Sequence, residues 1–226
     1  VLGLFTAWNI AIGLPAPFWA LYMLDRLEMS FFLVTLHTVV VLLVRLPVNA
    51  AWSRVIERVG SRRVLIACGS SVALIPLIWL VPTPDLVWPL YLEAVFSGVI
   101  WTGFNQAAFI QPMAALDPPD RSFGLALFGV CTGAALFAAA LAGGALLETM
   151  GAAEPSSFYV LFVASSILRA TTAVFALRLT EPGITMRAFF VSFVGNGVLR
   201  RPAGRVFVPV EVPPDEVPSS GGAAPS

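Results

Sequence analysis

The chain has 226 residues, of which 58% are hydrophobic and 12% are charged, and its formal net charge is zero. A soluble domain carries about 25% charged residues, so this composition excludes an ordinary water-soluble core, and the absence of net charge leaves no basic surface for nucleic acid. Two cysteines, Cys68 and Cys131, cannot build a disulfide scaffold. The excess of apolar residues predicts a membrane protein if these residues form runs of about 20, the length that crosses a bilayer.

Six apolar runs follow one another along the chain, separated by short polar segments. They cover residues 1–24, 31–52, 64–81, 86–116, 122–147 and 158–179. Hydrocarbon offers no partner to free backbone N–H and C=O groups, so runs of this length must form helices, and the alternating period of barrel strands is absent. The sequence therefore predicts an all-α membrane protein in which six transmembrane helices form one bundle over residues 1–182.

Arginine supplies all thirteen basic residues and is distributed unevenly between the loops. The loops after the first, third and fifth runs hold Arg26 alone. The loops after the second and fourth runs and the C-terminal tail hold Arg54, Arg58, Arg62, Arg63, Arg121, Arg187, Arg200, Arg201 and Arg205. Because positively charged loops stay in the cytoplasm, this bias predicts that both ends of the chain are cytoplasmic, in agreement with an even number of helices.

The character of the chain changes after residue 182. Apolar residues recur at helical spacing over 183–201, which is typical of an amphipathic helix on the cytoplasmic membrane surface. A frayed, partly ordered tail is an equal alternative, because Gly195 and Gly197 weaken a helix. Pro, Gly, Ser and Val dominate residues 202–226, and we expect disorder there.

A short basic segment, residues 53–65, joins the second and third runs. Gly60 permits the unusual backbone angles of a tight turn between helices, and Glu57 can cap a helix or pair with an arginine. The arginines expected at the cytoplasmic surface are Arg58, Arg62 and Arg63. Taken alone, the segment can be an anchor that fixes the membrane topology and nothing more.

This segment resembles the signature loop of the major facilitator superfamily of transporters, Gly-x-x-x-Asp-Arg-x-Gly-Arg-Arg. Ser53 replaces the first glycine, Glu57 replaces the aspartate, and Ser61 is inserted before the arginine pair. Four further stretches resemble helices ten to twelve of a bacterial branch of the family: 101–109, 117–121, 142–147 and 166–169. The resemblance implies the C-terminal half, helices seven to twelve, of a twelve-helix transporter in the bacterial cytoplasmic (inner) membrane, whose N-terminal six-helix half is the missing partner. It also implies a gating loop formed by Glu57, Arg58, Gly60, Arg62 and Arg63.

The same resemblance implies that the six helices form two inverted three-helix repeats. The loop after the fifth run should then echo the loop after the second run. Glu148-Thr-Met-Gly151 does echo Glu57-Arg-Val-Gly60. The arginines are missing from the second copy, as the positive-inside rule requires for an outer loop.

Charged side chains and the one histidine lie inside the predicted spans, where a charge costs about 2.5–3.5 kcal/mol. Glu93 lies roughly 10 Å from the outer end of the fourth helix, and Arg45 lies at a similar depth in the second. A Glu93 neutralised by burial can take up a proton and couple transport to the proton gradient, and an ion pair or hydrogen bond with a neighbouring helix is an equal alternative. The sixth helix is peripheral in the resembling family, so we expect Arg169 to pack structurally or extend to the membrane surface. We expect His37 to be a satisfied packing residue.

Helices one and four of each half line the central cavity in the resembling family. The fourth run carries polar or aromatic side chains at spacings of four, and the first run carries one amide. The candidate substrate contacts are therefore Asn9, Glu93, Ser97, Trp101 and Asn105. Small residues at such positions can equally serve helix packing, which is the interpretation we give to Gly129-x-x-x-Gly133 in the fifth run.

The resemblance implies a secondary transporter that moves a small molecule by alternating access within the lipid bilayer, with Glu93 as the candidate proton-coupling residue. We expect no enzyme activity, no cofactor, no bound metal and no nucleic-acid partner. The alternative is a self-contained six-helix membrane protein of another class, such as an intramembrane enzyme. The sequence lacks the catalytic motifs that such an enzyme would need. A single histidine excludes a His-Glu-x-x-His zinc site, and the Gly-x-Ser-Gly motif of a serine protease is absent.

Overall fold

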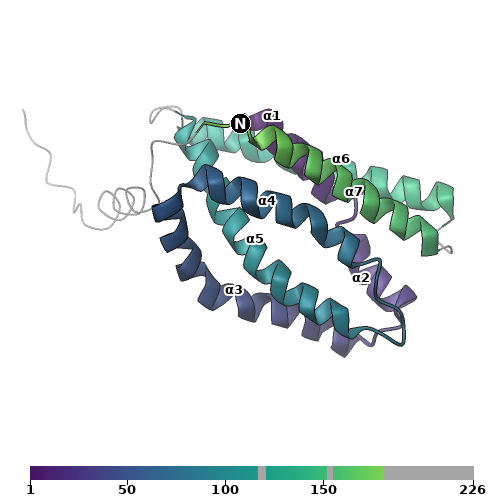
Figure 1. The fold of residues 1–226 in the computed structure, drawn as a ribbon. Helices are drawn as coiled ribbons and strands as arrows, with labels where there is room; N and C mark the ends of the chain where they lie inside the picture. Colours follow the sequence, from purple (N-terminus) through teal and green to yellow (C-terminus); the bar gives the residue numbers. More distant parts are fainter. Residues whose placement is uncertain (117–120, 152–154, 181–226) are drawn as a thin grey trace, which may run out of the picture. The chain divides into compact units, whose positions relative to one another are not determined.

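A computed structural model describes residues 1–116, 121–151 and 155–180, and in these residues the only regular secondary structure is helical. The elements are α1 (Leu2–Gly13), α2 (Phe18–Leu21), the π-helical turn η1 (Tyr22–Arg26), α3 (Phe31–Val59), α4 (Ser61–Ile78), α5 (Trp88–Ala114), α6 (Arg121–Met150) and α7 (Pro155–Ala176) (Figure 1). Each of the six predicted apolar runs is helical, which confirms the all-α prediction. The surface helix predicted over 183–201 and the disorder predicted over 202–226 lie outside the described residues.

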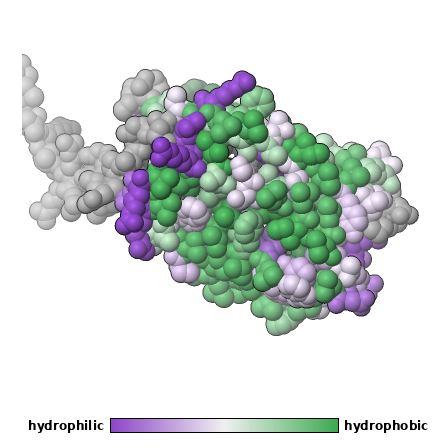
Figure 2. All heavy atoms as spheres, viewed as in Figure 1, coloured by the Kyte–Doolittle hydropathy of each residue, from purple (hydrophilic) through white to green (hydrophobic). Residues whose placement is uncertain are grey.

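Five helical segments are long and apolar enough to cross a membrane: Leu2–Arg26, Phe31–Val59, Ser61–Ile78, Arg121–Met150 and Ser156–Ala176. The chain is therefore an integral membrane protein. Figure 2 shows mainly apolar residues on the visible face, with hydrophilic residues gathered towards its ends. The fourth predicted run forms α5, which has 27 residues but is not among the five, because polar side chains such as Glu93 and Gln111 lower its hydropathy.

The first apolar run is interrupted, although the sequence predicts a span over 1–24. α1 ends at Gly13, and α2 begins at Phe18 after a turn that contains Pro15 and Pro17. Proline has no N–H to donate and its ring crowds the preceding turn, so two prolines this close stop a regular helix. The first predicted span is therefore not one continuous α-helix.

The basic segment over 53–63 is not a loop, which corrects the prediction. α3 continues to Val59 and α4 begins at Ser61, so Gly60 alone separates them. The backbone of Gly60 has φ 96° and ψ 149°, a conformation that strains residues with a side chain. Hydropathy marks where a helix leaves the hydrocarbon and not where it ends, so the polar last turns of α3 were mistaken for a loop.

Helix packing follows a small set of pairs within one compact unit that holds all described residues. α1 packs mainly on α6, α3 packs on α5, and α4 packs on both α5 and α7, while α7 also packs on α1. Two glycines permit the close approach of α6 to the first span: a Cβ at Gly13 would collide with the carbonyl of Leu136, and one at Gly143 would collide with the carbonyl of Leu14. Small residues at helix contacts are the usual means of tight packing in membranes.

The packing role predicted for Gly129 and Gly133 is wrong within the described chain. A Cβ added at either position would have no atom within 4 Å, and both glycines are exposed. The buried residues of α6 are Thr132, Ala139, Gly143 and Leu147, so the packed side of the helix passes between these two glycines without including them. Two glycines four residues apart leave one side of a helix without side chains. This spacing permits a close helix contact on that side but does not show that another helix packs there.

Candidate functional site

A cavity of about 440 Å³ opens between the helices, and its lining comes from every described long helix except α6. Glu93, Ser97 and Trp101, which were predicted as substrate contacts on one side of α5, all line it. The other polar or charged lining residues come from α3 and α7: His37, Thr38, Arg45 and Arg169. A cavity with apolar walls and a few converging polar groups is the usual form of a small-molecule site.

Glu93 and His37 form a buried pair across the α3–α5 contact. Nε2 of His37 lies 3.1 Å from Oε2 of Glu93, and the two residues are only 8% and 3% exposed. This is the hydrogen-bonded partner that the sequence analysis weighed as an alternative for Glu93. It also satisfies the buried imidazole of His37, in agreement with the packing role expected for this residue.

Arg169 reaches the same cavity from α7 and is 2% exposed, so it does not extend to the membrane surface. Its Nη1 donates to the carbonyl of Val72 on α4 at 3.4 Å, and its guanidinium carbon lies 5.9 Å from the ring centre of Trp101. Glu93 is close enough for electrostatic attraction to Arg169. Of the two alternatives predicted for Arg169, structural packing is the one observed, because α7 is packed against both α4 and α1.

Arg45 adds a second guanidinium to the lining from the middle of α3. The residue is half-buried, and its Nε has no hydrogen-bond partner within the described part of the chain. The Nε of Arg169 is unpartnered in the same sense. Each of these two arginines therefore has a guanidinium N–H without a partner among the described residues, whereas buried polar groups normally have partners.

Tryptophan rings form much of the remaining wall. Trp19 from α2, Trp79 at the end of α4 and Trp101 from α5 all line the cavity. The ring centres of Trp19 and Trp79 are 4.5 Å apart, and Trp79 also meets His37 edge-on at 5.7 Å. Trp19 and Trp79 could not be predicted as lining residues from the sequence, because neither lies on α5 and their elements reach the site only through packing.

Two predicted contacts are not part of this cavity. Asn9 lies on α1 and donates its side-chain N–H to the carbonyl of Phe5 in its own helix at 2.8 Å. Asn105 is exposed and does not line the cavity. The neighbouring Gln106 instead bridges α5 to α3, where it donates to the carbonyl of Asn49 at 2.9 Å and accepts from the hydroxyl of Ser53 at 3.2 Å.

The residues of the predicted gating loop lie at the α3–α4 junction, away from the cavity lining. Glu57 and Arg58 are exposed on the last turn of α3, and Arg63 is exposed on the first turn of α4. Arg62 donates from Nη2 to the carbonyl of Leu177 at 2.6 Å, just after the end of α7. This hydrogen bond connects the α3–α4 junction to the end of α7. Arg62 therefore has a structural role in addition to the positive charge that helps to fix the membrane topology.

We expect Arg62→Ala to lower the melting temperature of the purified protein in detergent by about 2–4 °C, because it removes a charge-assisted hydrogen bond worth about 1 kcal/mol. Arg63→Ala is the matched control, since it removes the same charge from an exposed neighbour. Equal melting temperatures for the two variants would show that the Arg62 contact does not stabilise the fold.

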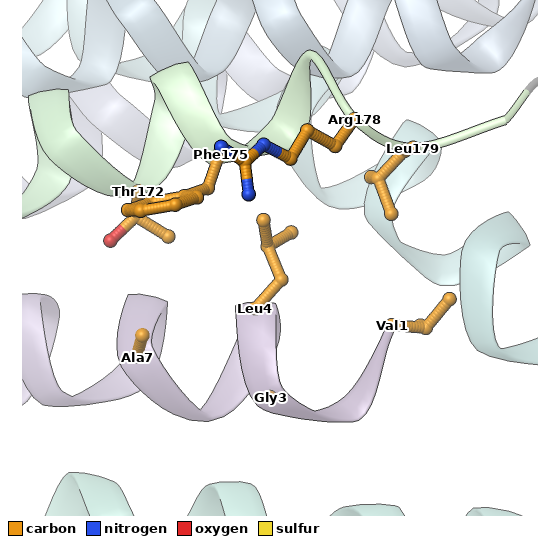
Figure 3. A pocket seen from close by; sticks show the side chains of 8 residues that line it. All are labelled: Val1, Gly3, Leu4, Ala7, Thr172, Phe175, Arg178 and Leu179. Atoms are coloured by element: carbon orange, nitrogen blue, oxygen red, sulfur yellow. The ribbon is translucent and has the colours of Figure 1, made fainter.

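A second hollow, drawn in Figure 3, lies between the start of α1 and the end of α7. Its walls are largely apolar, with Leu4 and Ala7 on α1 facing Phe175 and Leu179. Among the described residues, the charged side chain in its lining is that of Arg178, whose guanidinium carbon lies 5.2 Å from the ring centre of Phe175. With no buried ionisable pair, this hollow offers less chemistry than the cavity around Glu93.

Residues 1–116, 121–151 and 155–180 contain no group of three His, Cys, Asp or Glu side chains that could hold a metal ion. The chemistry of the cavity therefore rests on the buried Glu93–His37 pair, two arginines and three tryptophans. No family model, curated protein or solved structure matches the chain.

Proposed function

We propose that the chain is the C-terminal six-helix half of a secondary transporter of the major facilitator type, which moves a small solute by alternating access. The observation that carries this proposal is the buried Glu93–His37 pair, at 3.1 Å, on the wall of a cavity that α5 and several helices long enough to cross a membrane line together. Ionisable groups in such positions mark solute or proton pathways, because their burial in a membrane is costly. We assign transport and no enzymatic reaction to this site.

The packing of the helices supports two repeats of three spans. One repeat comprises the α1–α2 span, α3 and α4, and the other comprises α5, α6 and α7. If the repeats are exchanged, the contact of α1 with α6 becomes that of α5 with α3, and the contact of α4 with α5 becomes that of α7 with α1. The contact of α4 with α7 maps onto itself. An approximate two-fold relation between repeats produces this pattern.

The two middle helices of these proposed repeats also end alike. α3 has 29 residues and is followed by Gly60 at φ 96°, while α6 has 30 residues and is followed by Gly151 at φ 86°. Each glycine stands three residues after a glutamate, Glu57 or Glu148. The similarity of sequence noted between these segments is therefore accompanied by a similarity of backbone conformation.

The same two helices are the least covered of the spans. Only 6% of the most apolar window of α3 is buried and 11% of that of α6, against 50% for α4. We propose that one side of α3 and α6 packs against an N-terminal six-helix half of the same chain and that lipid covers the rest. Rocking of the two halves would then expose the cavity alternately to each side of the membrane.

The orientation that we propose follows from the arginines. The α3–α4 junction, with Arg54, Arg58, Arg62 and Arg63, lies on the cytoplasmic side of a bacterial inner membrane. There the exposed Glu57 and Arg58 can meet charged groups of the other half when the transporter closes. In this arrangement the junction acts as the cytoplasmic gate, and the Gly60 turn holds the two helix ends together.

The direct test is a solute screen with the intact transporter, this chain together with its proposed N-terminal half, in proteoliposomes. Uptake of at least one solute class should exceed that of empty liposomes and should increase when the lumen is made alkaline. Uptake that does not depend on the pH gradient would contradict the proposed proton coupling. Absence of six further spanning segments upstream of residue 1 in the gene would contradict the half-transporter assignment.

A further inference from the structure

The charges around the cavity do not balance. Arg45 and Arg169 contribute two positive charges, and an ionised Glu93 contributes one negative charge. His37 adds no charge when it is neutral and a further positive charge when it is protonated. The described lining residues from α1, α2 and α4 are apolar or aromatic, so they cancel nothing. A surplus of positive charge at a site within the membrane favours an anionic ligand.

The arginine side chains are equipped to bind that anion. Arg169 is almost fully buried. It donates from Nη1 to the carbonyl of Val72, and its Nε has no hydrogen-bond partner among the described residues. The Nε of Arg45 is likewise unpartnered. A guanidinium presents parallel N–H groups whose spacing matches the two oxygens of a carboxylate. The polar side chains Thr38 and Ser97 can add neutral donors from the same lining.

The rest of the lining selects the body of the ligand. Trp19, Trp79 and Trp101 give the cavity three large aromatic rings, and Trp101 also lies beside the Arg169 guanidinium. Such rings bury flat apolar groups well, with pairs of rings preferring offset or edge-on contact. A volume of about 440 Å³ lies within the range of small-molecule sites. The cavity thus combines cationic donors with an aromatic wall.

We propose that this cavity binds an organic monocarboxylate with a flat, apolar body, held at its carboxylate by Arg169 with a contribution from Arg45. The proposal rests on the transport function proposed above and names its substrate class. Glu93 attracts Arg169 and so competes with the carboxylate of the ligand. The titratable groups around Glu93 are His37 and Arg45 from α3 and Arg169 from α7, with Tyr91 beside His37. Protonation of Glu93 therefore strengthens binding of the anion.

The test uses benzoate, 2-naphthoate and indole-3-acetate as probes of the intact transporter in detergent, with the corresponding amides and amines as matched controls. We expect at least one carboxylate to raise the melting temperature and to quench tryptophan fluorescence, with the amide at least about tenfold weaker. Glu93→Gln removes the negative charge that competes with the ligand, so this variant should bind the anion at least about fivefold more tightly than the unchanged protein.

Two arginine variants locate the site. Arg169→Gln should abolish carboxylate binding, and because loss of this buried cation can itself prevent folding, Arg45→Gln serves as the second variant and should weaken binding roughly tenfold. Arg54→Gln is the control, since Arg54 is exposed and lies outside the lining. Equal binding of amides or amines, or unchanged carboxylate binding by Arg45→Gln, would overturn the proposal.

The two proposals fail in different ways. Carboxylate binding without any solute uptake in proteoliposomes would contradict the transport function and leave the anion site standing. Uptake of a neutral or cationic solute, with no carboxylate binding by the same protein, would support transport and overturn the anion site. Binding measurements in detergent and uptake measurements in liposomes are therefore both required.

Discussion

Glu93→Gln should abolish the component of solute uptake that a pH gradient drives, while expression and downhill exchange of the solute persist. Glutamine has the size of glutamate, and its side-chain oxygen can still accept a hydrogen bond from Nε2 of His37 across the 3.1 Å contact. It cannot bind and release a proton. The measurement is uptake into proteoliposomes with and without an imposed gradient, on samples matched for the amount of inserted transporter.

Asp85→Asn is the matched control for this substitution. Asp85 is an exposed carboxyl in the segment between α4 and α5 and takes no part in the cavity, so the gradient dependence should remain. His37→Gln keeps a hydrogen-bond donor beside Glu93 and should also retain coupling. If His37→Gln loses the gradient dependence and Glu93→Gln retains it, the proton is carried by the imidazole and the assignment to Glu93 is wrong.

The helices could be predicted from the sequence because their cause is local. A run of about 20 apolar residues in lipid has no alternative to a helix, so all six runs are helical. Their ends could not be placed in the same way. α3 extends to Val59 beyond the apolar run that ends at 52, because a helix can continue into water when polar residues such as Arg54 and Glu57 cover it.

The candidate site could be predicted only in part, because the spacing of residues along a helix shows which side chains of that one helix lie on the same side. It does not show which side chains of other helices face them. A spacing of four residues rotates about 40° at each step, so Ser97 and Trp101 stay near Glu93, whereas Asn105, three steps away, has turned by about 120°. This rotation explains why Asn105 is exposed. Asn9 belongs to α1, which ends before the proline-containing turn. Its spacing from later residues of the first run therefore could not predict which of them lie on the same side of one helix.

The partners of Glu93 depend on tertiary packing. His37 lies 56 residues before it, and Arg169 comes from α7, which packs mainly on α4 and α1. One feature of the sequence did point to these partners. Charges buried in a membrane need partners, and the interiors of the predicted spans hold one glutamate, two arginines and one histidine. Only a few pairings among these four side chains are possible. Choosing among these pairings required the contact of α3 with α5.

Gly143→Ala should destabilise the protein, whereas the same change at the adjacent Gly144 should leave it as stable or more stable. Alanine is about 1 kcal/mol better than glycine within a helix, so propensity favours both variants equally. At Gly144 the new Cβ would lie 3.6 Å from the end of the Phe18 ring, an ordinary contact. At Gly143 it would collide with the backbone carbonyl of Leu14, which cannot move aside as a side chain can.

The expected cost at Gly143 is about 1–3 kcal/mol, which corresponds to a melting temperature lower by roughly 2–12 °C. Leu14 lies in the break of the first span, beside Ile12 and Ala16 of the cavity lining, so the same clash should also displace that wall and reduce solute uptake. Thermal unfolding of both variants in detergent measures the change in melting temperature, and uptake into proteoliposomes measures the effect on transport. Equal melting temperatures for the two alanine variants would mean that α6 does not approach the first span as closely as the glycine contacts require.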